Sequence, residues 1–344
     1  MNPEARRPFK VAAVQATSIY LDLRAGVEKA CRLTVEAAAG GAKLVVFPEA
    51  FLPGYPLWVW YVPAGDTATL RAAYAELLDN SVAVSDAAAR AAAVPDIAVE
   101  ALCETARETG VCISIGINER NVEASGTTLY NSNLVIGPDG RVLGCHRKLV
   151  PTGGERLVHA QGDGGSLETY ELPFGRLGGL ICWENYMPLA RYAMYAWGTQ
   201  IYVAPTWDRG EPWLSTLRHI AKEGRVYVVG CGMAVRKSDL PDRFAFKGKY
   251  LANAPEWLNA GDSVIVDPDG KVLAGPAHEC EEILYAEVDP DKLTGPRFQL
   301  DVAGHYARPD VFEFAVRKDI RPVARILRDP NRGSQDREAT AGPP

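Results

Sequence analysis

Three polar residues follow directly after apolar stretches of the sequence. Glu49 comes after LVVFP, Lys148 after RVLGCHR and Cys182 after GGLI. Open α/β sheets bind their ligands beyond the carboxyl ends of the strands, where residues that are distant in the sequence meet. If each apolar stretch is a strand, these three side chains are expected to converge on one site.

The three side chains fit a nucleophilic attack on an electrophilic carbon. Attack by cysteine requires a base for the thiol proton, a cation for the negative charge that develops and, later, an activated water. Cys182 would be the nucleophile, with Glu49 and Lys148 as base and cation. Pro188 marks a helix start beyond Cys182, so we expect backbone N–H groups and the helix dipole to favour the thiolate.

Each of these residues by itself also has a purely structural explanation. Free cysteine is among the most buried residue types, so Cys182 could be one more small core residue. A lone glutamate such as Glu49 is usually solvated, and Lys148 beside Arg147 could be part of a surface pair. Only the combination of the three positions favours a catalytic site.

Other kinds of reactive site lack their sequence signatures. His146 and His159 have no metal-ligand spacing with a carboxylate, so we predict no metal site. The sequence contains no G-x-x-x-x-G-K-[ST] loop and no strand-led G-x-G-x-x-G, so we predict no cofactor. It also has no G-x-S-x-G elbow, which leaves cysteine as the favoured nucleophile.

The composition is that of a globular protein that acts on small molecules. Of the 344 residues, 47% are apolar and 23% are charged, which allows one large α/β domain or two. The net charge of −6 and the absence of a long Lys/Arg run argue against nucleic acid and anionic membranes as partners.

Cysteine use and hydropathy indicate a cytoplasmic location. Seven scattered cysteines, none of them in C-x-x-C spacing, suggest neither a disulfide framework nor a zinc ribbon. No window approaches the roughly 18 uninterrupted apolar residues of a transmembrane helix. The basic N-terminus leads into no signal-peptide apolar region.

Strands and helices alternate along almost the whole chain. Apolar periodicity predicts strands at residues 9–17, 44–47, 111–118, 201–207, 226–231 and 283–289. It predicts a helix that ends at Gly40 and further helices around residues 67–78, 99–106, 189–197 and 213–221. Residues 131–145 and 262–275 are similar hairpins about Pro-Asp-Gly turns, which suggests two sheets that are each extended by one hairpin.

An aromatic segment, FLPGYPLWVWYVP at residues 51–63, is too irregular for a strand and too bulky for a solvated loop. We interpret it as a pocket wall. Flat apolar rings would suit aryl or arylalkyl groups, and the candidate rings are those of Tyr55, Trp58, Trp60, Tyr61, Tyr186 and Trp207. The alternative is that several of these rings pack in the core or at a subunit interface.

Three segments in this order resemble the signature blocks of the nitrilase superfamily of carbon–nitrogen hydrolases: VVFPEAFLPGYP, HRKLVPTGGER and GGLICWENYMP. The resemblance implies that Glu49 is the general base, Lys148 the stabilising lysine and Cys182 the nucleophile. It also implies that Glu155 is the second glutamate, which positions the lysine and the substrate. It covers residues 9–310 and implies a four-layer αββα sandwich and a homo-oligomer that is dimer-based or helical.

Further segments resemble the nitrilase branch itself, among them Cys-Trp-Glu at residues 182–184 and GHYARPDVF from Gly304. Members of this branch hydrolyse a small-molecule nitrile to the carboxylic acid and ammonia through covalent thioimidate and thioester intermediates. Gly153 and Gly154 depart from the pattern, since many relatives are bulkier there. With Trp183 as a hint that favours nitriles, we expect substrate contacts from Tyr55, Trp58, Trp183, Tyr186 and Trp207.

We predict a single hydrolase domain at residues 1–310 and a C-terminal extension at residues 311–344. The extension would begin with an interface segment. From Arg328 onward it is rich in Pro, Gly and charge, and we predict that this tail is disordered.

Two other functions remain open at this stage. An amidase or N-carbamoyl hydrolase would use the same Glu-Lys-Cys site, because an amide passes through the same thioester. A non-catalytic member would bind a small molecule or serve as an assembly subunit. A papain-like cysteine hydrolase is disfavoured because its partner would be a histidine, which no comparable motif supplies.

Overall fold

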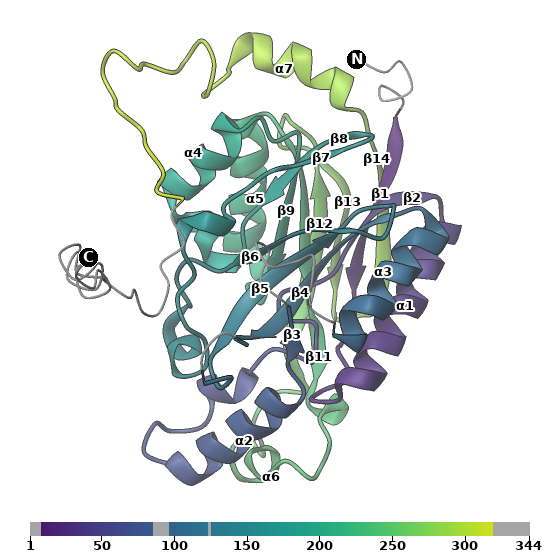
Figure 1. Ribbon diagram of the computed structural model, residues 1–344, viewed down its shortest axis with the longest axis vertical. Helices are drawn as coiled ribbons and strands as arrows, with labels where there is room; N and C mark the ends of the chain where they lie inside the picture. The colour runs from purple at the N-terminus through teal and green to yellow at the C-terminus, as the bar shows by residue number, and fades with distance from the viewer. Residues whose placement is uncertain (1–7, 85–95, 123–124, 319–344) are drawn as a thin grey trace, which may run out of the picture.

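Two seven-stranded β-sheets lie face to face in the part of the chain that the structure describes, residues 8–84, 96–122 and 125–318 (Figure 1). The structure is a computed structural model of the chain. Helices cover the outer face of each sheet, so the layers run helix, sheet, sheet, helix. The predicted four-layer αββα sandwich is confirmed.

The first sheet has the strand order β14-β1-β2-β4-β5-β6, and β3 pairs with β4. Parallel pairing joins β1 to β2 and β2 to β4, whereas β5, β6 and β14 join by antiparallel pairing. The bounds are β1 (Phe9–Gln15), β2 (Ala42–Val46), β3 (Val82–Ala83), β4 (Cys112–Arg120), β5 (Leu129–Ile136), β6 (Val142–Arg147) and β14 (Glu282–Val288).

The second sheet has the strand order β11-β12-β10-β9-β8-β7, and β13 pairs with β12. Its centre is the parallel trio of β8, β9 and β10. The bounds are β7 (Tyr170–Leu172), β8 (Gly175–Gly179), β9 (Ile201–Thr206), β10 (Tyr227–Gly232), β11 (Ala234–Arg236), β12 (Trp257–Val266) and β13 (Val272–His278).

The α-helices of the described residues begin and end at recognisable signals. Asp22 caps α1 by accepting from the Ala25 N–H, and α3 ends at Gly110 in the left-handed conformation. Pro188 is the first residue of α4, as predicted. The bounds are α1 (Leu23–Ala39), α2 (Thr67–Asp79), α3 (Ile97–Thr109), α4 (Pro188–Ala196), α5 (Gly210–Gly224), α6 (Ala245–Tyr250) and α7 (Thr294–Gln299).

Three apolar cores separate the four layers. On β1, Ala12 and Val14 face the core beneath α1 and α3, whereas Val11 and Ala13 face the core between the sheets. This alternation follows from the strand geometry, in which successive side chains point to opposite faces. The third core lies between the second sheet and the helices α4 and α5. The sequence of an inner strand is therefore apolar at successive positions, because both faces of the strand are buried.

The predicted strands and helices are largely confirmed, including the two hairpins. These are β5-β6 in the first sheet and β12-β13 in the second. The strand predicted before Cys182 is shorter than expected, because β8 ends at Gly179. The short elements β3, β7, β11, α6 and α7 were not predicted.

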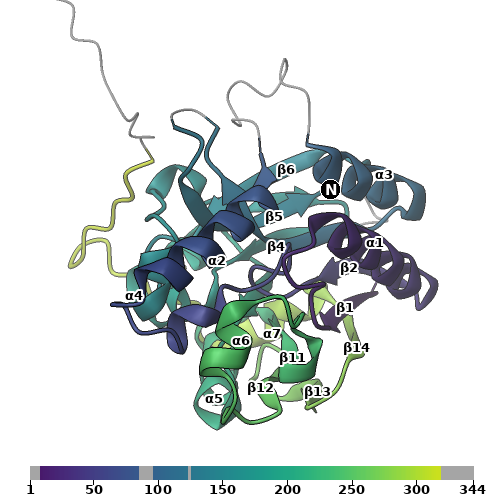
Figure 2. The ribbon, with the colours of Figure 1, turned by 90° about the horizontal axis from the view of Figure 1, so that it is seen from below.

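Segments distant in sequence meet at two ends of the molecule. Figure 2 shows α2 and α6 side by side, and Lys249 of α6 binds the α2 cap Asp66 at 2.7 Å. After α7 the chain returns along α4, where Phe314 packs edge-on against Tyr192 with ring centroids 4.9 Å apart.

The tail from Arg328 onward, which we predicted to be disordered, lies outside the described residues. Among the helices of the described ranges, none has both the length and the apolar character needed to cross a membrane.

Candidate active site

The structure brings Glu49, Lys148, Glu155 and Cys182 together, as the sequence predicted. Lys148 Nζ lies 2.7 Å from Glu49 Oε1 and 2.8 Å from Glu155 Oε2. Cys182 and Glu155 line one cavity. All four side chains are buried. Two carboxylates, one ammonium and one thiol thus share a site from which most water is excluded.

Glu49 is held by a loop that lies directly on β4. The loop continues the pairing of β2: Phe47 N–H donates to Ser114 O at 2.8 Å, and Gly116 N–H donates to Pro48 O at 3.2 Å. A Cβ at position 116 would lie 2.3 Å from Pro48 O. Glycine at this position therefore permits the close approach that fixes Glu49.

Lys148 and Glu155 are positioned by the segment that follows β6. The Lys148 N–H donates to Asn131 O at 2.8 Å, which continues the pairing with β5. Glu155 lies in the 3₁₀ helix Gly153–Leu157, and its Oε2 accepts from the Thr152 N–H at 2.9 Å. Seven residues after Lys148, the chain has thus folded back to place the second carboxylate beside the ammonium.

Cys182 is the first residue of the 3₁₀ helix Cys182–Tyr186 and has a φ of +52°. Non-glycine residues rarely adopt this conformation, and surrounding contacts must hold it in place. Asn185 supplies such contacts: its Nδ2 donates to Leu180 O at 2.9 Å and to Cys182 O at 2.8 Å. Tyr202 in turn donates to Asn185 Oδ1 at 2.7 Å. The Asn of the C-W-E-N sequence therefore stabilises the turn that carries the thiol.

The expectation that a helix start favours the thiolate is wrong. The helix α4 begins only at Pro188, beyond the 3₁₀ helix. Burial raises the pKa of the Cys182 thiol well above its usual range, and the nearby Glu49 charge raises it further, against the opposing effect of Lys148. The resting thiol is therefore neutral, and its proton has to be removed during the reaction.

The charged groups differ in their proton affinity. Burial raises the pKa of Glu49 although Lys148 opposes it. Burial also disfavours ionisation of Glu155, but the charge and hydrogen bonds of Lys148 outweigh it and lower the pKa of Glu155. Burial would lower the pKa of Lys148, yet Glu49, Cys182 and Glu155 together raise it. The site thus has a fixed cation, a fixed carboxylate at Glu155 and a more basic carboxylate at Glu49.

The hydrogen bonds that the described residues make to Glu49 leave one acceptor position of its carboxylate open for a proton. Oε1 accepts from Lys148 Nζ and from Asn131 Nδ2, both at 2.7 Å. Oε2 accepts from the Trp207 backbone N–H at 2.7 Å. Because each carboxylate oxygen has two acceptor positions, the remaining position lies on Oε2.

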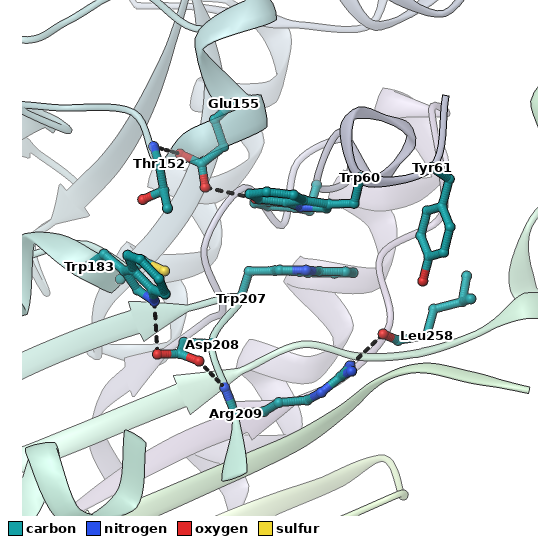
Figure 3. Close-up of a pocket in the computed structure, with 11 residues that line it drawn as sticks. Trp60, Tyr61, Thr152, Glu155, Trp183, Trp207, Asp208, Arg209 and Leu258 are labelled. Carbon is teal, nitrogen blue, oxygen red and sulfur yellow. Dashed lines mark hydrogen bonds between the residues drawn. The ribbon is translucent and has the colours of Figure 1, made fainter. Parts of the chain in front are cut away.

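The cavity has a volume of about 350 Å³ and a largely aromatic wall (Figure 3). Tyr55, Trp60, Tyr61 and Trp207, named from the sequence as candidate wall rings, line it, and so does Trp183, predicted to contact substrate. The further residues that line it are Thr152, Asp208, Arg209 and Leu258. Asp208 and Arg209 follow β9, so the strand-end rule that predicted the reactive residues could also have found them.

Trp58 and Tyr186, predicted to contact substrate, are not among the described residues that line the cavity. Trp58 is fully buried and packs against Phe246 with ring centroids 6.0 Å apart. In the 3₁₀ helix Leu57–Trp60, residues two apart point to different sides, so Trp60 faces the cavity instead. The Tyr186 hydroxyl donates to Asp208 Oδ2 at 3.3 Å.

Gly153 and Gly154 allow Trp60 to lie against the loop of Glu155. Gly153 has a φ of +48°, and a Cβ there would lie 3.0 Å from Trp60 Cη2. A Cβ on Gly154 would lie 2.9 Å from Val59 O. A bulkier loop would displace Trp60, so the two glycines shape the cavity wall.

Neither of the two histidines considered for metal binding lies in a ligand cluster. His146 pairs with Glu184, and His159 Nε2 lies 2.8 Å from Asn118 Oδ1. Within residues 8–84, 96–122 and 125–318, no three His, Cys, Asp or Glu side chains are grouped so as to hold a metal ion.

Residues 10–297 match the carbon-nitrogen hydrolase family. The chain belongs to the carbon-nitrogen hydrolase family. The hydrolase is 42% identical over 320 residues to an aliphatic nitrilase of Sinorhizobium fredii (strain HH103), which covers 93% of this chain and 98% of that protein. It is 39% identical over 311 residues to a bifunctional nitrilase/nitrile hydratase of Lupinus angustifolius, which covers 90% of this chain and 86% of that protein. These relatives place the hydrolase in the nitrilase branch.

Comparison with solved structures agrees with this fold. The hydrolase resembles Saccharomyces cerevisiae Nit3, a member of branch 10 of the nitrilase superfamily, with a TM-score of 0.65 and 22% identity. The similarity covers 87% of the hydrolase and 97% of Nit3. The αββα sandwich of the hydrolase is therefore the fold of this superfamily.

Proposed function

We propose that this hydrolase converts an organic nitrile and two waters into a carboxylic acid and ammonia, with Cys182 as nucleophile. The observation that carries the proposal is the buried network of Glu49, Lys148 and Glu155 beside the Cys182 thiol, in a cavity with an aromatic wall. The nitrilase relatives support the choice of a nitrile as substrate.

The first step forms a covalent thioimidate. Glu49 Oε2 accepts the thiol proton as Cys182 Sγ attacks the nitrile carbon, and the proton is delivered to the nitrile nitrogen. One π bond of the nitrile is replaced by the C–S bond and the N–H bond. The raised pKa of Glu49 supports its role as base, because a neutral buried thiol needs a strong proton acceptor.

The later steps each consume one water. Glu49 takes a proton from the first water, whose oxygen adds to the thioimidate carbon, and the resulting tetrahedral species expels ammonia to leave a thioester. A second water, activated in the same way, cleaves the C–S bond. The carboxylic acid leaves and the Cys182 thiol recovers its proton, so the enzyme is unchanged.

Lys148 stabilises the negative charge that develops on the substrate, and Glu155 keeps Lys148 in place. The ammonium is fully buried and contacts both carboxylates, so it needs no reorganisation at the moment of reaction. Glu155 is itself held by the Tyr55 hydroxyl at 2.7 Å. The Thr206 side chain partly offsets the effect of burial on the pKa of the Cys182 thiol.

The cavity supports a substrate of modest size with an apolar group. A volume of about 350 Å³ is at the small end of ligand pockets. Trp60, Trp183 and Trp207 present apolar rings around it. Asp208 and Arg209 add one polar edge to the cavity. This edge could hold a polar group of a small aliphatic or aromatic substrate whose nitrile carbon lies at Cys182.

We further propose that the protein is a cytoplasmic homo-oligomer built from dimers. Large apolar side chains are exposed on α4, on α7 and in the C-terminal segment, which is typical of surfaces that bind a partner: Leu189, Phe298, Val311 and Phe312. The seven free cysteines fit a reducing compartment. Light scattering of the purified protein tests the assembly, and a monomer at every concentration would contradict it.

The reaction class is tested by ammonia release from a panel of matched nitriles and amides. We expect nitrile turnover by the wild type and none by Cys182→Ala. Cys103→Ala, which alters a partly buried thiol on α3, is the matched control and should retain activity. Turnover of the amides alone would show an amidase. Absence of turnover, together with a Cys182 thiol that forms no adduct, would favour a non-catalytic member.

A further inference from the structure

The reaction sequence leaves unused a buried pair, His146 and Glu184, that lies close to the site. His146 Nε2 is 3.0 Å from Glu184 Oε2, and both side chains are buried. His146 belongs to β6 in the first sheet, whereas Glu184 follows β8 in the second. A buried ion pair by itself adds little net stability, because desolvation offsets the attraction. The pair does, however, connect the two sheets.

The carboxylate of Glu184 also binds the backbone beside two reactive residues. Its Oε1 accepts from the Leu149 N–H at 2.6 Å, and its Oε2 accepts from the Ile181 N–H at 2.7 Å. Leu149 directly follows Lys148, and Ile181 directly precedes Cys182. A single carboxylate thus joins the two chain segments that carry the ammonium and the thiol.

We propose that Glu184, held by His146, is a positioning residue that sets the placement of Lys148 relative to Cys182. The proposal rests on the function proposed above, and it assigns to Glu184 no contact with substrate. Reacting groups must be placed closely, since a displacement of about 1 Å can cost on the order of 100-fold in rate. Glu184 supplies hydrogen bonds that directly join the Lys148 segment to the Cys182 turn, and its loss would remove them.

The charge of Glu184 is essential to this bonding pattern. The carboxylate receives donors on both oxygens: two backbone N–H groups and the His146 ring. Burial would lower the pKa of His146, but Glu184, Ser166 and Asp163 outweigh burial and raise it. An ionised carboxylate can only accept, so the His146 Nε2–H is the donor to Glu184. A glutamine at position 184 would place an NH₂ group against one of these donors. Glu184→Gln therefore removes the link with almost no change in shape.

Glu119→Gln offers a matched control. Glu119 is likewise buried, and it binds Arg147, the residue between His146 and Lys148, at 2.6 Å. Successive side chains of a strand point to opposite faces, so Arg147 and Glu119 lie on the other face of the sheet from His146. The control variant thus removes a buried carboxylate whose partner, Arg147, directly precedes Lys148. Unlike Glu184, Glu119 has no contact with the backbone next to Cys182 among the hydrogen bonds of the described residues.

The test measures kcat and KM for a nitrile, the rate at which iodoacetamide alkylates Cys182, and the melting temperature. In Glu184→Gln we expect kcat to fall about 10- to 100-fold with KM changed less than about threefold, because binding groups stay in place. Alkylation should slow about tenfold, since the thiol loses its aligned base and cation. Glu119→Gln should lower the melting temperature but keep kcat and alkylation within about twofold of the wild type.

The outcomes separate this proposal from the proposed function. If the wild type turns over no nitrile, the function fails, while the alkylation rates still test the placement of the thiol. If Glu184→Gln matches Glu119→Gln in both kcat and alkylation, Glu184 has only a structural role and the proposal is overturned. Should Glu184→Gln fail to fold, His146→Gln decides: it keeps both backbone bonds, and we expect a smaller fall of about three- to tenfold in kcat. An unchanged kcat in that variant would overturn the proposal.

Discussion

Tyr55 and Trp207 stack face to face, with ring centroids 4.2 Å apart and planes 4° apart. Each residue of the stack also binds one of the two buried glutamates that contact Lys148. The Tyr55 hydroxyl donates to Glu155 and the Trp207 backbone N–H donates to Glu49, both at 2.7 Å. The wall of the cavity is therefore bonded to both carboxylates that flank Lys148.

Removing the Tyr55 hydroxyl should slow the reaction while leaving the stack intact. Tyr55→Phe keeps the ring against Trp207 but leaves Glu155 with one donor fewer, so Lys148 is held less firmly. Loss of a charged hydrogen bond of about 1.5 kcal/mol corresponds to about a tenfold fall in kcat. Steady-state kinetics check this. Tyr227→Phe, which loses a bond to Asp289 O at 3.2 Å far from the site, is the control, and equal effects in the two variants would argue against the prediction.

Removing the Lys148 charge should cost both activity and stability. Lys148→Met leaves Glu49 and Glu155 buried without their cation, and breaking a buried ion pair typically costs about 3 to 5 kcal/mol. We expect no detectable nitrile turnover and a free energy of unfolding lowered by about this amount in urea titrations.

A second variant separates the two effects. Lys148→Met combined with Glu155→Gln has one buried charge fewer, so we expect it to recover part of the lost stability. It should remain inactive, because no cation then faces the developing negative charge. Restored turnover in the double variant would show that Lys148 serves stability alone.

The acid limb of the pH profile should report Glu49. Burial raises the pKa of Glu49, and the base must be unprotonated to accept the thiol proton. With a nitrile that does not ionise, kcat/KM is therefore expected to fall as the pH drops through this raised value, above the ordinary glutamate pKa of about 4.3. The raised pKa of Lys148 keeps its charge throughout the neutral range. A profile that stays flat down to about pH 4 would contradict Glu49 as the base.

The reactive residues could be predicted because each follows a strand. Glu49, Lys148 and Cys182 all come after apolar runs, and the edge of a sheet gathers residues from such positions whatever their separation in the sequence. The arrangement of sheets and helices in layers was also predictable. A strand that is apolar on both faces has to be buried on both faces, so each sheet must lie between two other layers. The long-range pairing of β14 with β1 has no local signal, because it depends on contacts across almost the whole domain.

The electrostatics and the cavity wall were less accessible to sequence reasoning. The sequence places Cys182 near a helix start, but the pKa of its thiol depends on burial and on Glu49, which only the folded chain brings near. Glu184 reads as an ordinary neighbour of Cys182 until its contacts with Leu149 and His146 are known. The direction of side chains along a short 3₁₀ helix was equally hidden, so Trp58 was predicted for the wall together with Trp60, although only Trp60 lines the cavity.

Trp58 and Trp60 provide a matched pair for testing the cavity wall. Trp60 is 45% exposed and lines the cavity, whereas Trp58 is 1% exposed and packs in the core. Trp60→Ala should widen the cavity. We therefore expect a rise in the ratio of kcat/KM for a ring-bearing nitrile to kcat/KM for a short aliphatic nitrile. The expected rise is about threefold or more, which is typical of a change in one apolar contact. The melting temperature of this variant should change little, because the ring is half in solvent.

Trp58→Ala should show the opposite combination. Truncating a fully buried tryptophan costs about 3 to 5 kcal/mol of stability through the lost contacts and the cavity that remains. The ratio of kcat/KM between the ring-bearing and the aliphatic nitrile should stay at the wild-type value, because no atom of Trp58 lines the cavity. Thermal unfolding and the two-substrate ratio measure both effects on the same samples. A ratio that shifts in Trp58→Ala but not in Trp60→Ala would mean that the substrate binds on the other side of this 3₁₀ helix.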